Sequence, residues 1–231
     1  IKEEQFQQSM SDGLAAFHRN DYKLARSRLL QAKSLKPGSH EVSNALSQVD
    51  QAIRLSGIDK LRRAAQAAER SEDWQGALKS YLAVLDIDNN LQFAVRGKER
   101  SLEQIHIAKR IDFYLAKPQV LESDSQLKNA VLLLVEAKEI NPRGPMLTAR
   151  IKKLEQLVEV VQIPVKIAIE SDNLTRVAVY RVGKLGRFSV HELELRPGTY
   201  TVVGTRDGYQ DVRQKVVVKP GLQSLRITVK C

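Results

Sequence analysis

Cysteine is almost absent from this chain of 231 residues. The single one, Cys231, is the last residue, so no disulfide can form within the chain and cysteine usage does not decide the redox compartment. Aromatic residues are also scarce, at 5%. Binding of nucleic acid by base stacking needs exposed aromatic rings among basic side chains, so this composition does not favour a nucleic-acid partner.

Long apolar runs are missing as well. The longest extends from Ala130 to Val135, far short of the ~20 residues that a membrane helix needs. The first residue is Ile1 and not Met, which we interpret as the loss of preceding residues that could have included a signal peptide or an anchor helix. We therefore expect contact with a membrane only through a segment before residue 1.

No catalytic, metal-binding or cofactor-binding constellation is visible. The histidines are His18, His40, His106 and His191. They lack ligand spacing and cysteine partners, which argues against a bound metal. Residues 86–90 resemble the start of a calcium loop, but Leu91 and Gly97 stand where such a loop needs glycine and glutamate. We expect no enzyme activity, no catalytic residue and no cofactor.

The net charge of +10 is unevenly distributed. Residues 164–231 contain 12 Lys and Arg against 6 Asp and Glu, whereas the first 163 residues contain 25 against 21. Such a surplus is compatible with an ordinary solvated basic surface. The less favoured interpretation is attraction to an acidic partner, such as an anionic glycan, a lipid headgroup or nucleic acid.

What the chain does contain is a repeated helical pattern. Ala25, Ala77 and Ala130 lie 52 and 53 residues apart, and each is followed by a bulky residue four positions on and a small one seven positions on. Each copy ends at a stop signal: Lys36-Pro37, Asp88-Asn89 and Asn141-Pro142. A constant period of this size predicts stacked helical units that bury apolar faces only against their neighbours.

Apolar residues spaced three and four apart predict the individual helices. Asn20-Asp21 and Asp73 are predicted to cap the helices that start at Tyr22 and Trp74. A segment that begins near Val42 is predicted to end at Gly57, and a separate helix follows around residues 61–68. Later helices are predicted at residues 91–117 with a weak point at Gly97, after Ser123-Asp124-Ser125, and across Met146 to Leu157. On this interpretation each helix pair carries an extra helix.

These segments resemble tetratricopeptide repeats. The matching residues are Gly13-Leu14-Ala15-Ala16-Phe17, Asp21-Tyr22, Ala25, Ala32, Lys36-Pro37, Asp73-Trp74, Ala77, Tyr81 and Val84. The period departs from the 34 residues of that family. The resemblance implies a concave face that binds a peptide, and arginine suits a carboxylate because its planar fork donates two hydrogen bonds. The partner-binding residues that it implies are Lys60, Arg63, Arg70, Lys109, Arg110 and Phe113, with an acidic peptide or C-terminus as ligand. An ordinary solvated helix face is the alternative.

After Gln162-Ile163-Pro164 the period changes from helical to alternating, which is the rhythm of strands with one buried face. Strands are predicted at residues 165–169, 177–182, 188–195, 199–205, 212–218 and 225–229. Arg196-Pro197-Gly198 and Lys219-Pro220-Gly221 predict type II turns, and Asp207-Gly208 predicts a hairpin turn. Six or seven short strands predict a small antiparallel sandwich.

This block resembles a PEGA domain. The matching stretches are Val179 to Gly186, Leu195 to Val202 and Asp207-Gly208-Tyr209, whereas Arg187-Phe188 replaces the family's usual Thr-Pro. The resemblance implies a bacterial periplasmic or cell-envelope setting, with a membrane anchor nearby. Arg181, Lys184 and Arg187 surround one turn and form a candidate anion patch, for which a solvated hairpin tip is the alternative.

The sequence therefore predicts two domains: a tetratricopeptide-like helical array at residues 1–161 and a small PEGA-like antiparallel β-sandwich at residues 162–231. The function we predict is a non-enzymatic protein–protein interaction scaffold of the bacterial envelope, with helical repeats that bind a peptide or protein partner. The alternative is an accessory module that binds carbohydrate or peptidoglycan through the basic β-domain.

Overall fold

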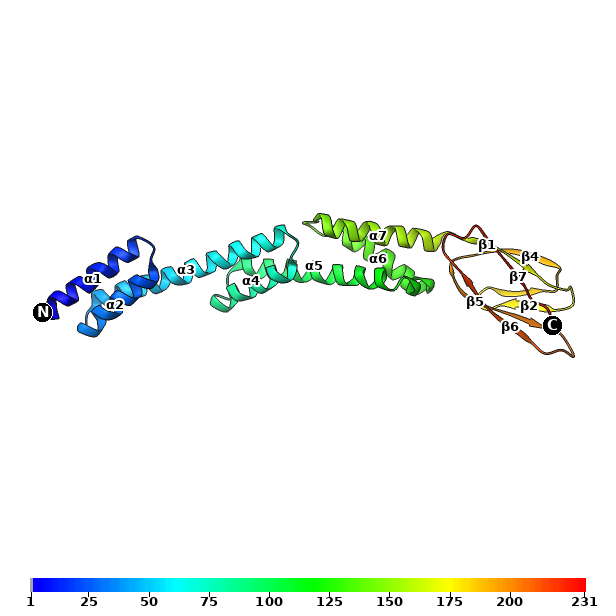
Figure 1. The fold of residues 1–231 in the computed structure, drawn as a ribbon, viewed down its shortest axis with the longest axis horizontal. Coiled ribbons are helices and arrows are strands. Elements are labelled where there is room, and N and C mark those ends of the chain that lie inside the picture. Colours follow the sequence, from blue (N-terminus) through cyan, green and yellow to red (C-terminus); the bar gives the residue numbers. More distant parts are fainter. Residues whose placement is uncertain (1) are drawn as a thin grey trace. The chain divides into compact units, whose positions relative to one another are not determined.

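The computed structural model describes residues 2–231, which form helices followed by strands, as expected (Figure 1). The helices are α1 (Lys2–His18), α2 (Tyr22–Leu35), α3 (His40–Arg70), α4 (Trp74–Ile87), α5 (Gln92–Ala116), the 3-10 helix η1 (Pro118–Glu122), α6 (Asp124–Glu139) and α7 (Pro145–Gln162). The chain forms two compact units, and the boundary between them lies inside α5. The N-terminal unit ends at Glu103 and the C-terminal unit starts at Gln104. Within the described residues, no helix combines the length and apolarity needed to cross a membrane.

The first core of the N-terminal unit lies between α1, α2 and the first half of α3. Its buried residues are Phe6, Ala16, Ala25, Leu29, Ala32, Val42, Ala45, Leu46 and Val49. Gly13 allows α1 and α2 to approach closely, since a Cβ there would lie 2.8 Å from Leu29 Cγ. Asp21 caps α2 as predicted, because its carboxylate accepts the Leu24 N–H at 3.1 Å.

The structure corrects the predicted break at Gly57, because α3 is one continuous helix from His40 to Arg70. Its first half packs in the core described above, and Leu61, Ala65 and Ala68 of its second half pack in a second core. Packing on both sides of Gly57 outweighs the ~1 kcal/mol that glycine costs inside a helix. The repeat of 52–53 residues therefore corresponds to one long and one short helix, and the extra helix per pair was a wrong prediction.

The second core of this unit contains α4 and the start of α5. Tyr81 is buried there, and a Cβ on Gly97 would overlap its ring, so glycine at this position allows the two helices to approach. Arg100 donates to the Glu69 carboxylate at 3.0 Å through Nε. Burial and the nearby Glu69 carboxylate raise the pKa of the Tyr81 hydroxyl. Gly97 is thus a packing position and not a weak point of α5, which is continuous.

In the C-terminal unit, the last part of α5 packs against α6 and α7. The largest fully buried residues of this cluster are Ile107, Ile111, Leu121, Leu133 and Leu154. Tyr114 donates its hydroxyl to Gln126 Oε1 at 3.1 Å, and Gln104 donates to the Pro142 carbonyl at 2.6 Å. These bonds join α5 to α6 and to the α6–α7 connection.

Two small sheets follow α7, and the change from helix to strand occurs where the sequence predicts it. The strands are β1 (Val165–Glu170), β2 (Arg176–Val179), β3 (Gly183–Gly186), β4 (Val190–Leu195), β5 (Gly198–Thr205), β6 (Val212–Val218) and β7 (Ser224–Thr228). One sheet has the order β4-β1-β7 and the other β3-β2-β5-β6. Their inward residues form one apolar cluster that includes Ile167 and Ile169 from the first sheet and Val177 and Val216 from the second.

Two features of the sheets differ from the expectation. All pairs are antiparallel except β1 and β7, which run parallel with Ile167 opposite Leu225. Strand β3 was not among the predicted strands, because its first and last residues are Gly183 and Gly186 and its only apolar side chain is the partly buried Leu185. The domain boundary between residues 161 and 162 stays a prediction, since the second compact unit contains both α7 and the sheets.

A carboxylate in the turn between β1 and β2 should make the stability of the fold depend on pH. The Asp172 carboxylate accepts N–H groups from Thr175 at 2.7 Å and Leu174 at 3.0 Å. These bonds, that of Thr175 above all, lower the pKa of Asp172 to about 2, below the ordinary ~3.9. A depressed folded-state pKa means stabilisation that is complete above about pH 4 and is lost as the pH falls towards 2.

We therefore expect Asp172→Asn to unfold at lower denaturant than the unchanged protein at pH 6, with the difference shrinking between pH 4 and pH 2. Denaturant midpoints of the two proteins across pH 2–6 measure it. A difference that is independent of pH would contradict this role for the carboxylate.

Candidate partner-binding surfaces

One line of side chains runs the length of α3 on a single face. Its members alternate at steps of four and three residues, which keeps them on that face. They are Val42, Leu46, Val49, Ile53, Ser56, Lys60, Arg63, Ala67 and Arg70. The first three are buried in the first core, whereas every member from Ile53 onward is exposed. We call the exposed half, Ile53 to Arg70, the α3 face.

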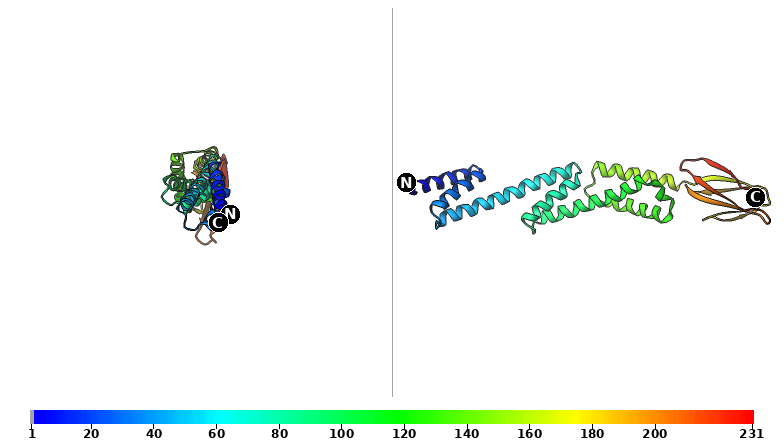
Figure 2. Two further views of the ribbon diagram at one scale, coloured as in Figure 1. Left: turned by 90° about the vertical axis from the view of Figure 1, so that its left-hand side faces the viewer. Right: turned by 60° about the horizontal axis from the view of Figure 1, so that its bottom comes forward.

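Different helices cover different sides of α3, which leaves this face open within the N-terminal unit. In the right-hand view of Figure 2, α1 and α2 lie beside the first half of α3, and α4 lies beside the second half. The second-half residues that pack with α4 are Leu61, Ala65 and Ala68, which are offset around the helix from Lys60 and Arg63. The face that α1 and α2 cover early in α3 thus continues without cover.

A hollow of about 680 Å³, the α2–α3 hollow, lies where the α3 face begins. Its lining includes Tyr22, Lys23, Arg26 and Leu30 from α2 and Ile53 and Ser56 from α3. Leu30 and Ile53 are both exposed apolar residues. The hollow therefore has an apolar part beside basic side chains.

The charged residues of α2 are all basic. Helix α2 contains Lys23, Arg26, Arg28 and Lys33 and no Asp or Glu. Arg26 pairs with Asp50 of α3 at 2.7 Å, with both side chains about half exposed. No ion pair engages Lys23 in the part of the chain that the structure describes. Asp21 lies at the rim, but its carboxylate is occupied as the cap of α2. Lys23 is therefore the cation of the α2 wall of the hollow that is free to pair with a negatively charged group.

Three of the residues predicted from sequence, Lys60, Arg63 and Arg70, lie on the α3 face and are exposed. Arg63 pairs with Asp59 one turn earlier on the same helix, an exposed contact of small energetic value. The hollow itself was missed. The alternation of fours and threes could have revealed its α3 wall, but only the tertiary structure shows that the line loses its cover after Val49.

The other three predicted residues belong to the C-terminal unit. Arg110 pairs with Glu136 of α6 at 2.6 Å, and Lys109 is exposed. Phe113 is exposed and helps to line a hollow of about 330 Å³ beside η1, together with Val120, Gln126 and Arg181. Two residues that the sequence assigned to separate sites, Phe113 and Arg181, are therefore neighbours.

The candidate anion patch is divided in the structure. Arg181 also lines a hollow of about 620 Å³ with Glu122, Asp124 and Arg196, and Asp124 pairs with Arg196. Lys184 and Arg187 are exposed, and neither lines this hollow. Because carboxylates surround Arg181, its environment is of mixed charge, which favours an anion less than a purely basic patch would.

The β4-β1-β7 sheet carries a further hollow, of about 440 Å³, which Ala168 helps to line. Its other lining residues are Lys166, Ile167, Glu192, Leu193, Glu194, Ser224, Leu225 and Arg226, without an aromatic ring. Among residues 2–231, no group of three or more His, Cys, Asp or Glu side chains could hold a metal ion.

The comparison with known proteins does not identify a family. The chain matches no protein-family model and none of the curated proteins. The fold and the surfaces define the protein only as a helical array with an open basic helix face, followed by two packed β-sheets. The tetratricopeptide and PEGA resemblances stay predictions that rest on the residues named above.

Proposed function

We propose that this protein is a non-enzymatic interaction scaffold whose helical part binds an acidic peptide segment of a protein partner. The segment enters the α2–α3 hollow and continues along the α3 face. In this proposal the helix pairs are tetratricopeptide-like and the two sheets form a small PEGA-like sandwich. The setting that the resemblance implies is the bacterial periplasm or cell envelope.

The observation that most supports the proposal is the change along the α3 line, which becomes exposed after Val49 and contains basic residues from Lys60 onward. Lys60, Arg63 and Arg70 follow the hollow over about 25 Å of helix, taking 1.5 Å per residue from Ile53. A peptide with a bulky apolar residue near one end and carboxylates after it matches that order of surfaces.

The alternative, glycan or peptidoglycan binding through the β-part, has less support. The hollow on the β4-β1-β7 sheet is lined by two carboxylates and two cationic side chains, and no aromatic ring lines it. The surface that places exposed apolar residues next to basic ones lies instead on α2 and α3.

A peptide library displayed on phage and selected against the full chain tests the proposal. We expect enrichment of peptides that combine Glu or Asp with Leu or an aromatic residue. The most enriched sequence, made as a labelled synthetic peptide, should bind at least about tenfold more weakly to Lys23→Glu with Arg26→Glu, because a charge-reversed wall repels it. Fluorescence anisotropy measures the affinity, which should also fall as salt is added.

The matched control is Lys152→Glu with Lys153→Glu on α7, which changes the net charge equally at exposed residues that do not line the hollow. This variant should keep the affinity of the unchanged protein. Basic peptides among the enriched set, or an equal loss in the two double variants, would refute a specific acidic site on α2 and α3.

A further inference from the structure

Helix α6 has apolar residues on its solvent side as well as on its core side. The core side contains Leu127, Ala130, Leu133, Leu134 and Ala137, all of them buried. On the opposite side Val131, Leu132 and Val135 are 40%, 57% and 58% exposed. Val135 lies four residues after Val131 and three after Leu132, so it is adjacent to both on the helix surface. Exposed apolar residues that gather in a stripe on one side of a helix are typical of an interaction surface.

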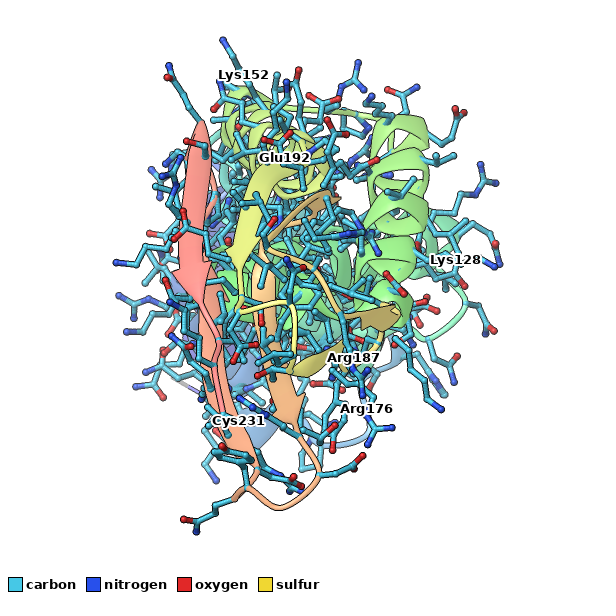
Figure 3. All side chains as sticks on the ribbon, turned by 90° about the vertical axis from the view of Figure 1, so that its right-hand side faces the viewer. Lys128, Lys152, Arg176, Arg187, Glu192 and Cys231 are labelled. Atoms are coloured by element: carbon cyan, nitrogen blue, oxygen red, sulfur yellow. The ribbon has the colours of Figure 1, made fainter. Side chains whose placement is uncertain are left out.

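Two charged residues stand at the ends of this stripe. Lys128, Leu132, Val135 and Glu139 follow at steps of four, three and four, so they form one line along the helix. Figure 3 shows Lys128 on the outward side of its helix. The line places a cation at the N-terminal end and a carboxylate at the C-terminal end, with only apolar residues between them.

The other charged residues of α6 are already paired within the protomer. Asp124 pairs with Arg196, Glu136 with Arg110, and Lys138 with Glu155. Within residues 2–231, no ion pair or hydrogen bond engages the side chain of Lys128 or of Glu139. The two unused charges of the helix are therefore the two that flank its exposed apolar residues.

We propose that this stripe is the interface with a second copy of the same chain, with the two α6 helices antiparallel about a two-fold axis. In that register Lys128 faces Glu139 of the second copy and Leu132 faces Val135 of the second copy, because both pairs are centred midway between residues 133 and 134. The interface is self-complementary, as two-fold symmetry requires. A parallel pair would instead oppose Lys128 to Lys128 and Glu139 to Glu139.

The small size of the stripe limits the affinity that the dimer can have. From Lys128 to Glu139 the line spans about 16 Å of helix, so it buries less than the roughly 800 Å² per partner of a standard interface. We expect a reversible dimer with a dissociation constant of roughly tens of micromolar. The spacing of fours and threes is that of a coiled-coil seam, which suits two helices in close side-by-side contact.

Sedimentation equilibrium of the full chain across a wide range of concentrations tests the proposal. A reductant is present throughout, because Cys231 could otherwise link two copies. We expect a monomer–dimer equilibrium for the unchanged protein and a monomer for Leu132→Asp. The matched control is Leu55→Asp on α3, since Leu55 is also 57% exposed, and it should dimerise like the unchanged protein.

Charge reversal tests the register. Lys128→Glu and Glu139→Lys should each weaken the dimer by about tenfold or more, since each places two like-charged pairs in contact. An equimolar mixture of the two variants should form a mixed dimer of nearly normal affinity, and so should the doubly reversed protein with itself. A protein that stays monomeric at all concentrations, single variants that dimerise normally, or a mixture that fails to associate would each overturn the proposal.

Discussion

Replacing Gly97 by alanine should destabilise the N-terminal unit, although alanine is the better helix former. The added Cβ would overlap the ring of Tyr81, which is buried and lies beside the Arg100–Glu69 pair. Overpacking of this kind costs about 1–3 kcal/mol, and the ~1 kcal/mol gained from helix propensity offsets only part of it. We expect a net loss of up to about 2 kcal/mol. Trp74, the single tryptophan, is buried in α4 and reports unfolding of this unit by its fluorescence.

Gly57→Ala is the matched control, because Gly57 is also inside a long helix but a Cβ there would meet nothing within 4 Å. It should stabilise the same unit by about 0.5–1 kcal/mol. Opposite signs for the two substitutions would confirm that packing against Tyr81, and not helix propensity, decides the result. Equal stabilisation by both would show that the ring moves away at little cost.

Replacing Leu133 by alanine should cost about 2–5 kcal/mol of the stability of the C-terminal unit, the largest effect that we expect. Leu133 is fully buried between the helices of this unit, and truncation leaves a cavity that close-packed neighbours fill only in part. Hydrogen exchange of the amides of α6 and α7 measures the loss in this unit separately from the other.

The neighbouring residue supplies the control. Leu132→Ala removes the same atoms from a side chain that is 57% exposed, so the monomer should lose less than about 0.5 kcal/mol. Both proteins should be measured at a concentration below that of any self-association. A loss for Leu132→Ala as large as that for Leu133→Ala would mean that α6 is oriented differently from the structure described above.

Much of the local structure was predictable from the sequence alone. Asp21 and Asp73 cap α2 and α4 as predicted, because a cap bond joins atoms only three residues apart. The change of rhythm after Gln162 correctly marks the passage from helix to strand. Half of the predicted partner-binding set, Lys60, Arg63 and Arg70, lies on the open α3 face, whose function stays a prediction.

The sequence by itself determined the helices, their caps, the repeat of 52–53 residues and the change to strands, since side-chain spacing and short-range hydrogen bonds decide these features. Only the tertiary structure decided whether Gly57 and Gly97 interrupt a helix, because neighbouring helices supply the packing that keeps α3 and α5 continuous. It also decided which half of the α3 line is covered and that β7 runs parallel to β1. Such features depend on contacts between residues far apart in the chain, which no local pattern of residues records.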